Sequence, residues 1–283
     1  MLASVELSQG TIRYRDTGSG EPIVFVHGAL VNGALWRKVT PPLEREHRCV
    51  VPDLPLGSHE NAMRAEADLS PPGLARLIAE LIEELELEQP TLVGNDTGGA
   101  LCQLVATQHA DRVGRLVLTP CDAYENFLPP AFRYLQVAAR IPGGTALLAQ
   151  SMRLGFVRRA PIAYGWLAKR PLPSELLDAW ASPVIHDPGV RRDAGKLLRG
   201  ISKRYTLEAA DRLRGFDRPT LIAWAPEDRF FKPAHAERLA KAIPNARLVW
   251  IEDSLTFVPE DQPERLAEEI ARFIRDTRAG AGG

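Results

Sequence analysis

Short apolar segments alternate with helical patterns along most of this chain, and that alternation restricts its fold more than any other feature. Most of these segments are too continuously apolar to have one face in water, so they predict buried strands of a parallel sheet joined by crossover helices. Apolar periodicity predicts a helix over residues 72–85 capped by Ser70, a helix over 100–109 and a closing helix from residue 262. The expected strands are residues 11–15, 23–26, 49–52, 91–93, 113–118, 220–224 and 247–251.

The strand pattern stops between residues 122 and 216. This segment is helical in pattern, is interrupted by prolines and contains most of the tyrosines. A chain of 283 residues is close to the size at which one core divides, so one main domain with an insertion suits this length. We therefore expect an α/β core domain of residues 1–121 and 217–283, and a helical cap of residues 122–216.

The charge balance narrows the class of partner. Lysine and arginine number 35 against 36 acidic residues, which gives no electrostatic reason to expect nucleic acid or a membrane surface and suits a small molecule. The three cysteines lie in apolar segments, which favours buried thiols and a reducing, cytoplasmic setting. The sequence contains no leader-like or membrane-length apolar segment, no metal-ligand spacing and no phosphate-loop motif. We expect no cofactor, and a monomer or a homodimer.

Residues 94–98, GNDTG, have the glycine–x–nucleophile–x–glycine pattern of a sharp turn between a strand and a helix. A carboxylate at such a strained and partly desolvated turn costs free energy and serves no structural purpose, so a functional role for Asp96 is favoured. Upstream, residues 27–29, HGA, end another expected strand and match the turn that lends a backbone N–H to an oxyanion hole. The two N–H donors would be those of Ala29 and Thr97.

With these two motifs the chain resembles the α/β-hydrolases, specifically the branch with an aspartate nucleophile that includes epoxide hydrolases and haloalkane dehalogenases. The resemblance extends from residue 11 to residue 277 and implies an α/β-hydrolase fold, with a mostly parallel eight-stranded sheet, flanking helices and a helical cap. It also implies that Asp228, after the strand over 220–224, is the acid of the catalytic triad. Asp122 stands near the alternative acid position that some dehalogenases use.

The chain departs from this family at the catalytic histidine. Residues 252–263 are similar to the family's histidine segment, and Thr256 stands where the histidine would be. In the family the carboxylate attacks carbon to form an ester, and the histidine activates the water that hydrolyses it. Threonine cannot accept that proton near neutral pH, so the second step is slow, the base has moved or the chemistry is different.

The six histidines supply candidates for a base that has moved. We single out His59, because it lies in the loop after the strand over 49–52, at the carboxyl edge of the sheet where ligands bind in such folds. His47, His109 and His235 are expected on helices or at their surface ends, as solvated or capping residues. His186 is expected in a cap loop that could overhang the site.

The cap supplies further candidates. Epoxide hydrolases protonate the opening ring with cap tyrosines, and this cap contains Tyr124, Tyr134 and Tyr164, with Trp166 beside them. Packing within the cap explains any single one of these aromatic residues equally well. The resemblance to haloalkane dehalogenases is incomplete, because they have a tryptophan after the aspartate that holds the leaving halide, and this chain has Thr97 there. Dehalogenation is therefore disfavoured.

Three functions remain open at this point. The first is a hydrolase of the epoxide or ester type, acting on a small to medium apolar substrate with Asp96 as nucleophile and a triad that lacks histidine. The second is a lyase, isomerase or cyclase in which Asp96 is a general base whose pKa is raised by burial under the cap. The third is a ligand-binding protein that has kept the pocket and lost its catalysis.

Overall fold

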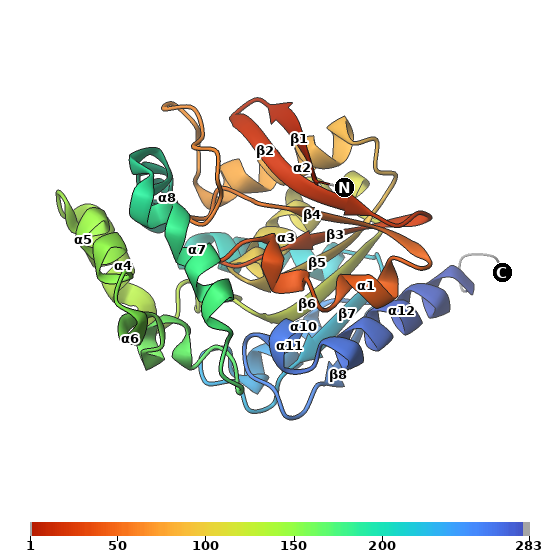
Figure 1. Ribbon diagram of the computed structural model, residues 1–283. Coiled ribbons are helices and arrows are strands. Elements are labelled where there is room, and N and C mark those ends of the chain that lie inside the picture. The colour runs from red at the N-terminus through yellow and green to blue at the C-terminus, as the bar shows by residue number, and fades with distance from the viewer. Residues whose placement is uncertain (1, 280–283) are drawn as a thin grey trace.

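The computed structural model describes residues 2–279 and contains one eight-stranded sheet (Figure 1). The strand order is β1-β2-β4-β3-β5-β6-β7-β8. β2 is antiparallel to both β1 and β4, and every other neighbouring pair is parallel, which confirms the expected α/β-hydrolase architecture. The strands are β1 (Leu2–Leu7), β2 (Gly10–Thr17), β3 (Glu21–Val26), β4 (His47–Pro52), β5 (Thr91–Asp96), β6 (Arg115–Cys121), β7 (Thr220–Trp224) and β8 (Ala246–Trp250).

The sequence pattern did not predict β1. This strand pairs with β2 along its whole length, from Leu2 opposite Arg15 to Leu7 opposite Gly10. Most of its side chains are exposed or half-buried, because an edge strand in an antiparallel hairpin keeps one face in water. A search for continuously apolar segments therefore does not select it.

Helices cover both faces of the sheet (Figure 1). α2 (Pro71–Glu84) contacts α3 (Thr97–Gln108), and α1 (Thr40–Leu43) contacts α12 (Pro263–Ala279) on the other face. The helix expected over 72–85 is confirmed to within one residue, and the Ser70 hydroxyl accepts the Gly73 N–H at 3.3 Å as its N-cap. α9 (Lys203–Arg212) lies within the segment that the sequence assigned to the cap, but it contacts α3 of the core. α10 (Pro233–Ala242) contacts β7 and β8, and α11 (Val258–Asp261) contacts α12.

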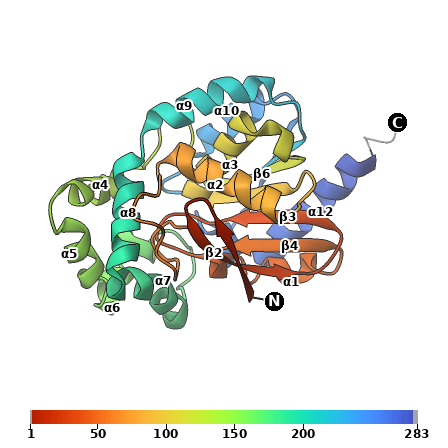
Figure 2. The ribbon, with the colours of Figure 1, turned by 90° about the horizontal axis from the view of Figure 1, so that it is seen from above.

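The long segment between β6 and β7 contains the cap helices, which lie to one side of the sheet in Figures 1 and 2. Hydrogen bonds join this segment to loops at the carboxyl edge of the sheet. The Tyr164 hydroxyl donates to Leu30 O, the Ser58 hydroxyl donates to Trp180 O, and the Phe257 N–H donates to Leu167 O. The cap helices are α4 (Arg133–Arg140), α5 (Gly144–Ser151), α6 (Gly155–Arg158), α7 (Ser174–His186) and α8 (Pro188–Gly200).

Two expectations about the interior have different outcomes. Cys49, Cys102 and Cys121 are all buried and free, as expected from their apolar surroundings. His47 does not lie on a helix or at the surface, because it is the first residue of β4 and only 1% exposed. The sequence placed the start of this strand two residues too late, and His47 therefore looked like a surface residue.

Candidate active site

The turn between β5 and α3 holds Asp96 in a left-handed backbone conformation, with φ of +54°. Such a conformation is strained for a residue with a side chain, and it turns the carboxylate away from the strand. A Cβ added to Gly98 would lie 2.3 Å from Val26 O, so the glycine permits the close approach of helix and strand. A Cβ added to Gly28 would lie 2.1 Å from Asp96 Oδ2, so Gly28 makes room for the carboxylate itself.

The Asp96 carboxylate contacts the two expected oxyanion donors. The backbone N–H groups of Thr97 and Ala29 hydrogen-bond to it and lower its pKa. Burial has the larger and opposite effect, and together with the nearby charge of Asp228 it raises the pKa of Asp96 to about 7. The residue still keeps some accessible surface. Asp96 is thus a carboxylate that exchanges its proton near neutral pH at the carboxyl edge of the sheet.

Asp228 lies in the loop after β7 and contacts the residue at the histidine position. Its Oδ1 accepts the N–H groups of Phe230 and Phe231, both at 2.7 Å. Its Oδ2 accepts the Thr256 hydroxyl at 2.8 Å. Burial raises the pKa of Asp228 to about 6, although these hydrogen bonds lower it. The two residues that the resemblance places at the acid and histidine positions are therefore joined by a hydrogen bond.

Asn95, beside Asp96, holds the Thr256 segment against the turn. Its amide Nδ2 donates to Thr256 O at 2.7 Å and to the Thr119 hydroxyl at 2.8 Å. All three residues are fully buried. Sequence reasoning treated Asn95 as a spacer of the motif, and no pattern in the sequence reveals that it joins two segments 161 residues apart.

Asp122 comes directly after β6 and lies against the same turn. Its N–H donates to Asp96 O at 3.4 Å, and its Oδ2 accepts the Thr97 hydroxyl at 3.3 Å. Its Oδ1 has no hydrogen-bond partner within residues 2–279. Burial and the charge of Asp96 raise the pKa of Asp122 well above its ordinary value, so Asp122 holds its proton more strongly than a free carboxyl group does.

His59 is held by the cap. Its Nδ1 accepts the Gly57 N–H at 3.4 Å, and its Nε2 lies 3.3 Å from Asp193 Oδ2 on α8. Among the hydrogen bonds of the described chain, none joins His59 to Asp96. The ring therefore connects the loop after β4 to the cap. His27 is also structural, since its Nε2 accepts the Leu54 N–H at 2.9 Å and burial lowers its pKa to about 4.

The aromatic cap residues separate into two groups. The Tyr164 hydroxyl donates to Leu30 O at 2.6 Å, directly after the Ala29 donor, and its ring lies 5.4 Å from that of Trp180. The Tyr134 hydroxyl instead donates to Ile162 O within the cap at 2.7 Å. The ring of Tyr124 lies 3.8 Å from the Arg238 guanidinium. Tyr164 is therefore the cap tyrosine that contacts the oxyanion turn.

Two of the expected cap contacts lie at the surface. Trp166 is 45% exposed and lies beneath the guanidinium of Arg229. His186 is exposed and ends α7 rather than lying in a loop, and its Nδ1 contacts Ser182 O at 3.0 Å. Neither side chain overhangs Asp96, because each is bound to its own surface neighbours.

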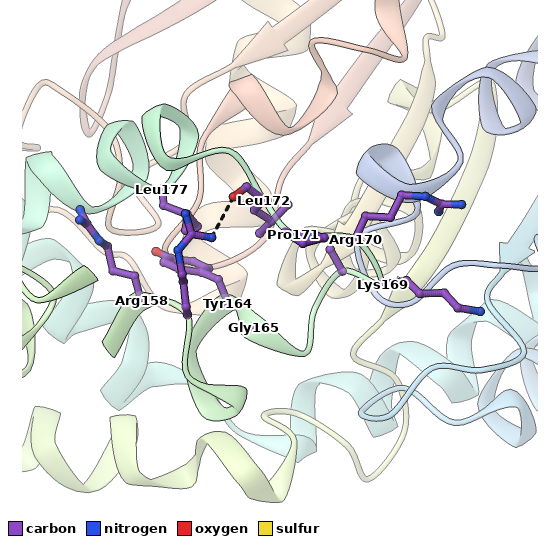
Figure 3. A pocket seen from close by; sticks show the side chains of 10 residues that line it. Arg158, Tyr164, Gly165, Lys169, Arg170, Pro171, Leu172 and Leu177 are labelled. Atoms are coloured by element: carbon purple, nitrogen blue, oxygen red, sulfur yellow. Dashed lines mark hydrogen bonds between the residues drawn. The ribbon is translucent and has the colours of Figure 1, made fainter. Parts of the chain in front are cut away.

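A cavity of about 250 Å³ lies in the cap beside Tyr164 (Figure 3). Its lining residues include Arg158, Arg159, Lys169 and Arg170, and Figure 3 shows Arg158 at the opposite end from Lys169 and Arg170. Asp96 is not among its lining residues.

Within residues 2–279 no cluster of three or more histidine, cysteine or acidic side chains is arranged to hold a metal ion. No helix in the same part of the chain has the length and apolarity to cross a bilayer.

Comparison with known proteins agrees with this geometry. Residues 21–263 match the model of the alpha/beta hydrolase fold family. Haloalkane dehalogenase 2 of Mycobacterium tuberculosis is 28% identical over 271 residues, which cover 93% of this chain and 91% of that protein. A cis-3-alkyl-4-alkyloxetan-2-one decarboxylase of Shewanella oneidensis is 25% identical, over 94% of this chain and 86% of its own length. The crystal structure of an ancestral haloalkane dehalogenase superposes with a TM-score of 0.82 at 24% identity, covering 98% of this chain and 100% of that chain.

Proposed function

This chain belongs to the α/β-hydrolase fold family, and from that premise we propose that it is a hydrolase whose nucleophile is the carboxylate of Asp96. The proposed substrate is a small to medium apolar molecule of the epoxide or ester type, bound under the helical cap. One observation carries the proposal. The turn holds Asp96 in a strained backbone conformation in which its side chain stays partly accessible. The carboxylate occupies the space that a side chain at Gly28 would fill.

In the first step an Asp96 carboxylate oxygen attacks an electrophilic carbon of the substrate. A bond forms from Asp96 to an alkyl carbon while the bond from that carbon to the leaving oxygen breaks. The oxygen of an opened epoxide takes up a proton from solvent water, whereas the carboxylate released from an alkyl ester stays ionised. The N–H groups of Ala29 and Thr97 already contact this carboxylate. They are therefore in place to stabilise negative charge on the ester when water later attacks it.

The second step needs a base for that water, and we infer that Asp228 supplies it through Thr256. With a pKa of about 6, Asp228 is mostly ionised at pH 7. The Thr256 hydroxyl donates to Asp228, and its oxygen lone pairs are able to accept from water. As the water oxygen bonds to the ester carbon of Asp96, the water proton passes to Thr256 and the Thr256 proton passes to Asp228. The bond from that carbon to the substrate oxygen then breaks, and this oxygen takes the proton back by the same route, which frees Asp96 and Asp228. A threonine is a poorer relay than an imidazole, so we expect the ester on Asp96 to accumulate.

The remaining candidate acids and bases fit this assignment less well. The side chain of Asp122 accepts the Thr97 hydroxyl, and burial raises its pKa well above its ordinary value. Asp228 instead accepts the Thr256 hydroxyl, so the base is assigned to Asp228. Both ring nitrogens of His59 are already engaged, since Nδ1 accepts the Gly57 N–H and Nε2 contacts Asp193. The proton relay is therefore assigned to Thr256. Two of the similar proteins are haloalkane dehalogenases by name, but a threonine follows Asp96 in this chain. We therefore propose epoxides and esters as substrates in preference to alkyl halides.

The test is intact-protein mass spectrometry after incubation with a panel of epoxides, esters and alkyl halides. We expect an adduct that peptide mapping places on Asp96, and none on Asp96→Asn. The same peptide map detects any deamidation of the asparagine back to aspartate. Full turnover by Asp96→Asn that has not deamidated would refute a nucleophilic Asp96.

A second candidate function is non-hydrolytic chemistry with Asp96 as general base. It is favoured by the pKa of about 7, which suits proton abstraction at neutral pH, and by a relative whose name describes a decarboxylase. In this case the panel yields product or solvent deuterium in the substrate, and no adduct forms at any time. Ligands that raise the melting temperature without being consumed would instead indicate a binding protein.

A further inference from the structure

The whole chain is nearly neutral, but one segment of the cap contains cationic side chains and no acidic ones. Residues 126–174 contain no aspartate or glutamate. The same residues contain seven cationic side chains: Arg133, Arg140, Arg153, Arg158, Arg159, Lys169 and Arg170. A uniformly cationic segment of this length favours an anionic partner, which the total of 35 basic and 36 acidic residues does not reveal.

The exposed apolar side chains gather in the same segment. Within residues 2–279, nine large hydrophobic residues are exposed, and seven of them lie between residues 137 and 166. We call residues 133–166 the cap rim. Leu147 and Phe156 are each 74% exposed. The other five are Val137, Ile141, Leu154, Ile162 and Trp166. Exposed apolar residues concentrated in this way mark an interaction site rather than ordinary surface.

Cations and apolar residues share one face of a rim helix. On α4, the exposed Arg133, Val137 and Arg140 are spaced by four and three residues, so they lie along one stripe that Ile141 continues. The buried Ala139 lies on another side of α4, which contacts α8, and the half-buried Gln136 at the edge of that side donates its amide to Leu198 O at 3.0 Å. The packed side of α4 is therefore satisfied, and the mixed cationic and apolar side faces solvent.

The rim lies at the outer edge of the molecule. Figures 1 and 2 show α4, α5 and α6 as the cap elements farthest from the sheet. Four exposed cations near this edge make no ion pair within residues 2–279, namely Arg133, Arg140, Arg153 and Arg159. Arg158, Lys169 and Arg170 are instead paired with Asp178, Glu227 and Asp253. Of these four, Arg153 donates to Gln150, and Arg159 donates to Leu172 O and Ser174 Oγ, but none has its charge neutralised by an acidic partner among the described residues.

We propose that the cap rim binds an anionic lipid surface. Short amphipathic helices that combine arginine with exposed leucine and phenylalanine lie in the plane of a membrane interface, with the apolar side chains among the acyl chains and the cations at the headgroups. Arginine suits this role because its aliphatic stem lies along apolar surface while its guanidinium reaches outward. This inference does not rest on the proposed function, since it concerns binding without turnover.

The chemistry of the rim disfavours other occupants. A second copy of the chain docked face to face would bring like charges together across a two-fold axis. Nucleic acid would satisfy the arginines but leave Leu147 and Phe156 in water. An anionic lipid surface satisfies both sets of side chains at once.

Binding is measured by co-flotation of the whole protein, without substrate, with vesicles of phosphatidylcholine that contain about one-third phosphatidylglycerol. We expect binding to these vesicles at low salt, and much weaker binding to pure phosphatidylcholine or at high salt. Arg133→Gln with Arg153→Gln should weaken binding about 25-fold, since each cation near an anionic surface accounts for about fivefold. Leu147→Ser with Phe156→Ser should weaken it at least about tenfold.

Matched variants control for general effects. Arg45→Gln with Arg275→Gln removes two exposed cations from the opposite end of the molecule, and Leu207→Ser removes an exposed leucine outside the rim. Both should bind vesicles as the wild type does. Equal loss in the control and rim variants would overturn the proposal, as would no binding to anionic vesicles. Sedimentation that shows a dimer abolished by the rim variants would also overturn it, in favour of self-association.

Discussion

We expect Asp96→Asn to be more stable than the wild type, and we expect this advantage in the free energy of unfolding to be larger at high pH than at low pH. Burial raises the pKa of this carboxyl from 3.8 to about 7 in the folded protein. A group with a raised folded pKa contributes stability below its unfolded pKa and loses it as the pH rises through the folded pKa. The wild type therefore loses stability at Asp96 between pH 3.8 and about 7, and the asparagine variant does not.

The size of the effect follows from the pKa. Each pKa unit corresponds to about 1.4 kcal/mol, so the ionised Asp96 costs the folded protein about 4 kcal/mol above pH 7. Between about pH 5 and about pH 8.5, the advantage of Asp96→Asn over the wild type should grow by about 3 kcal/mol. A difference between two pH values cancels any effect of the amide that does not depend on pH.

The assay is urea denaturation of both proteins at the two pH values, with the free energy of unfolding extrapolated to water. Asp111→Asn, at a carboxylate with a 78% exposed side chain, controls for the loss of a surface charge. A pH-independent difference between Asp96→Asn and the wild type would refute the reasoning. It would mean that the carboxylate is ionised in the folded protein at little cost, and that its strained position carries no stored free energy.

Three further predictions concern the same site. Thr256→Val removes a hydrogen bond to the buried Asp228, so it should raise the pKa of Asp228 above about 6 and cost about 2 kcal/mol of stability at high pH, as urea denaturation measures. Thr256→His should shorten the lifetime of the Asp96 ester in a chase after labelling, and an unchanged lifetime would contradict the relay. Gly28→Ala should abolish labelling of Asp96, because its Cβ would lie 2.1 Å from Oδ2, whereas Gly215→Ala, which has open space around it, should label normally.

The sequence alone was sufficient for the frame of the protein. Continuous apolar segments predicted seven strands and the sheet class, because strands buried on both faces need apolar side chains at every position. The turn at residues 94–98 placed Asp96 between strand and helix, since few sequences fit so crowded a turn. The position of Thr256 opposite Asp228 also followed from sequence, through the resemblance, and the structure joins the two by a hydrogen bond.

Only the tertiary structure decided which side chains meet. His59 looked like a free base in sequence, but its partner Asp193 is 134 residues away on a cap helix. Trp166 and His186 looked like cap contacts, but each lies at the surface, because the sequence shows which residues belong to a short helix and not which side of it faces the core. The pKa of Asp96 and the exposed face of the cap rim belong to this class too. Burial is the sum of contacts between distant segments, and no local pattern contains it.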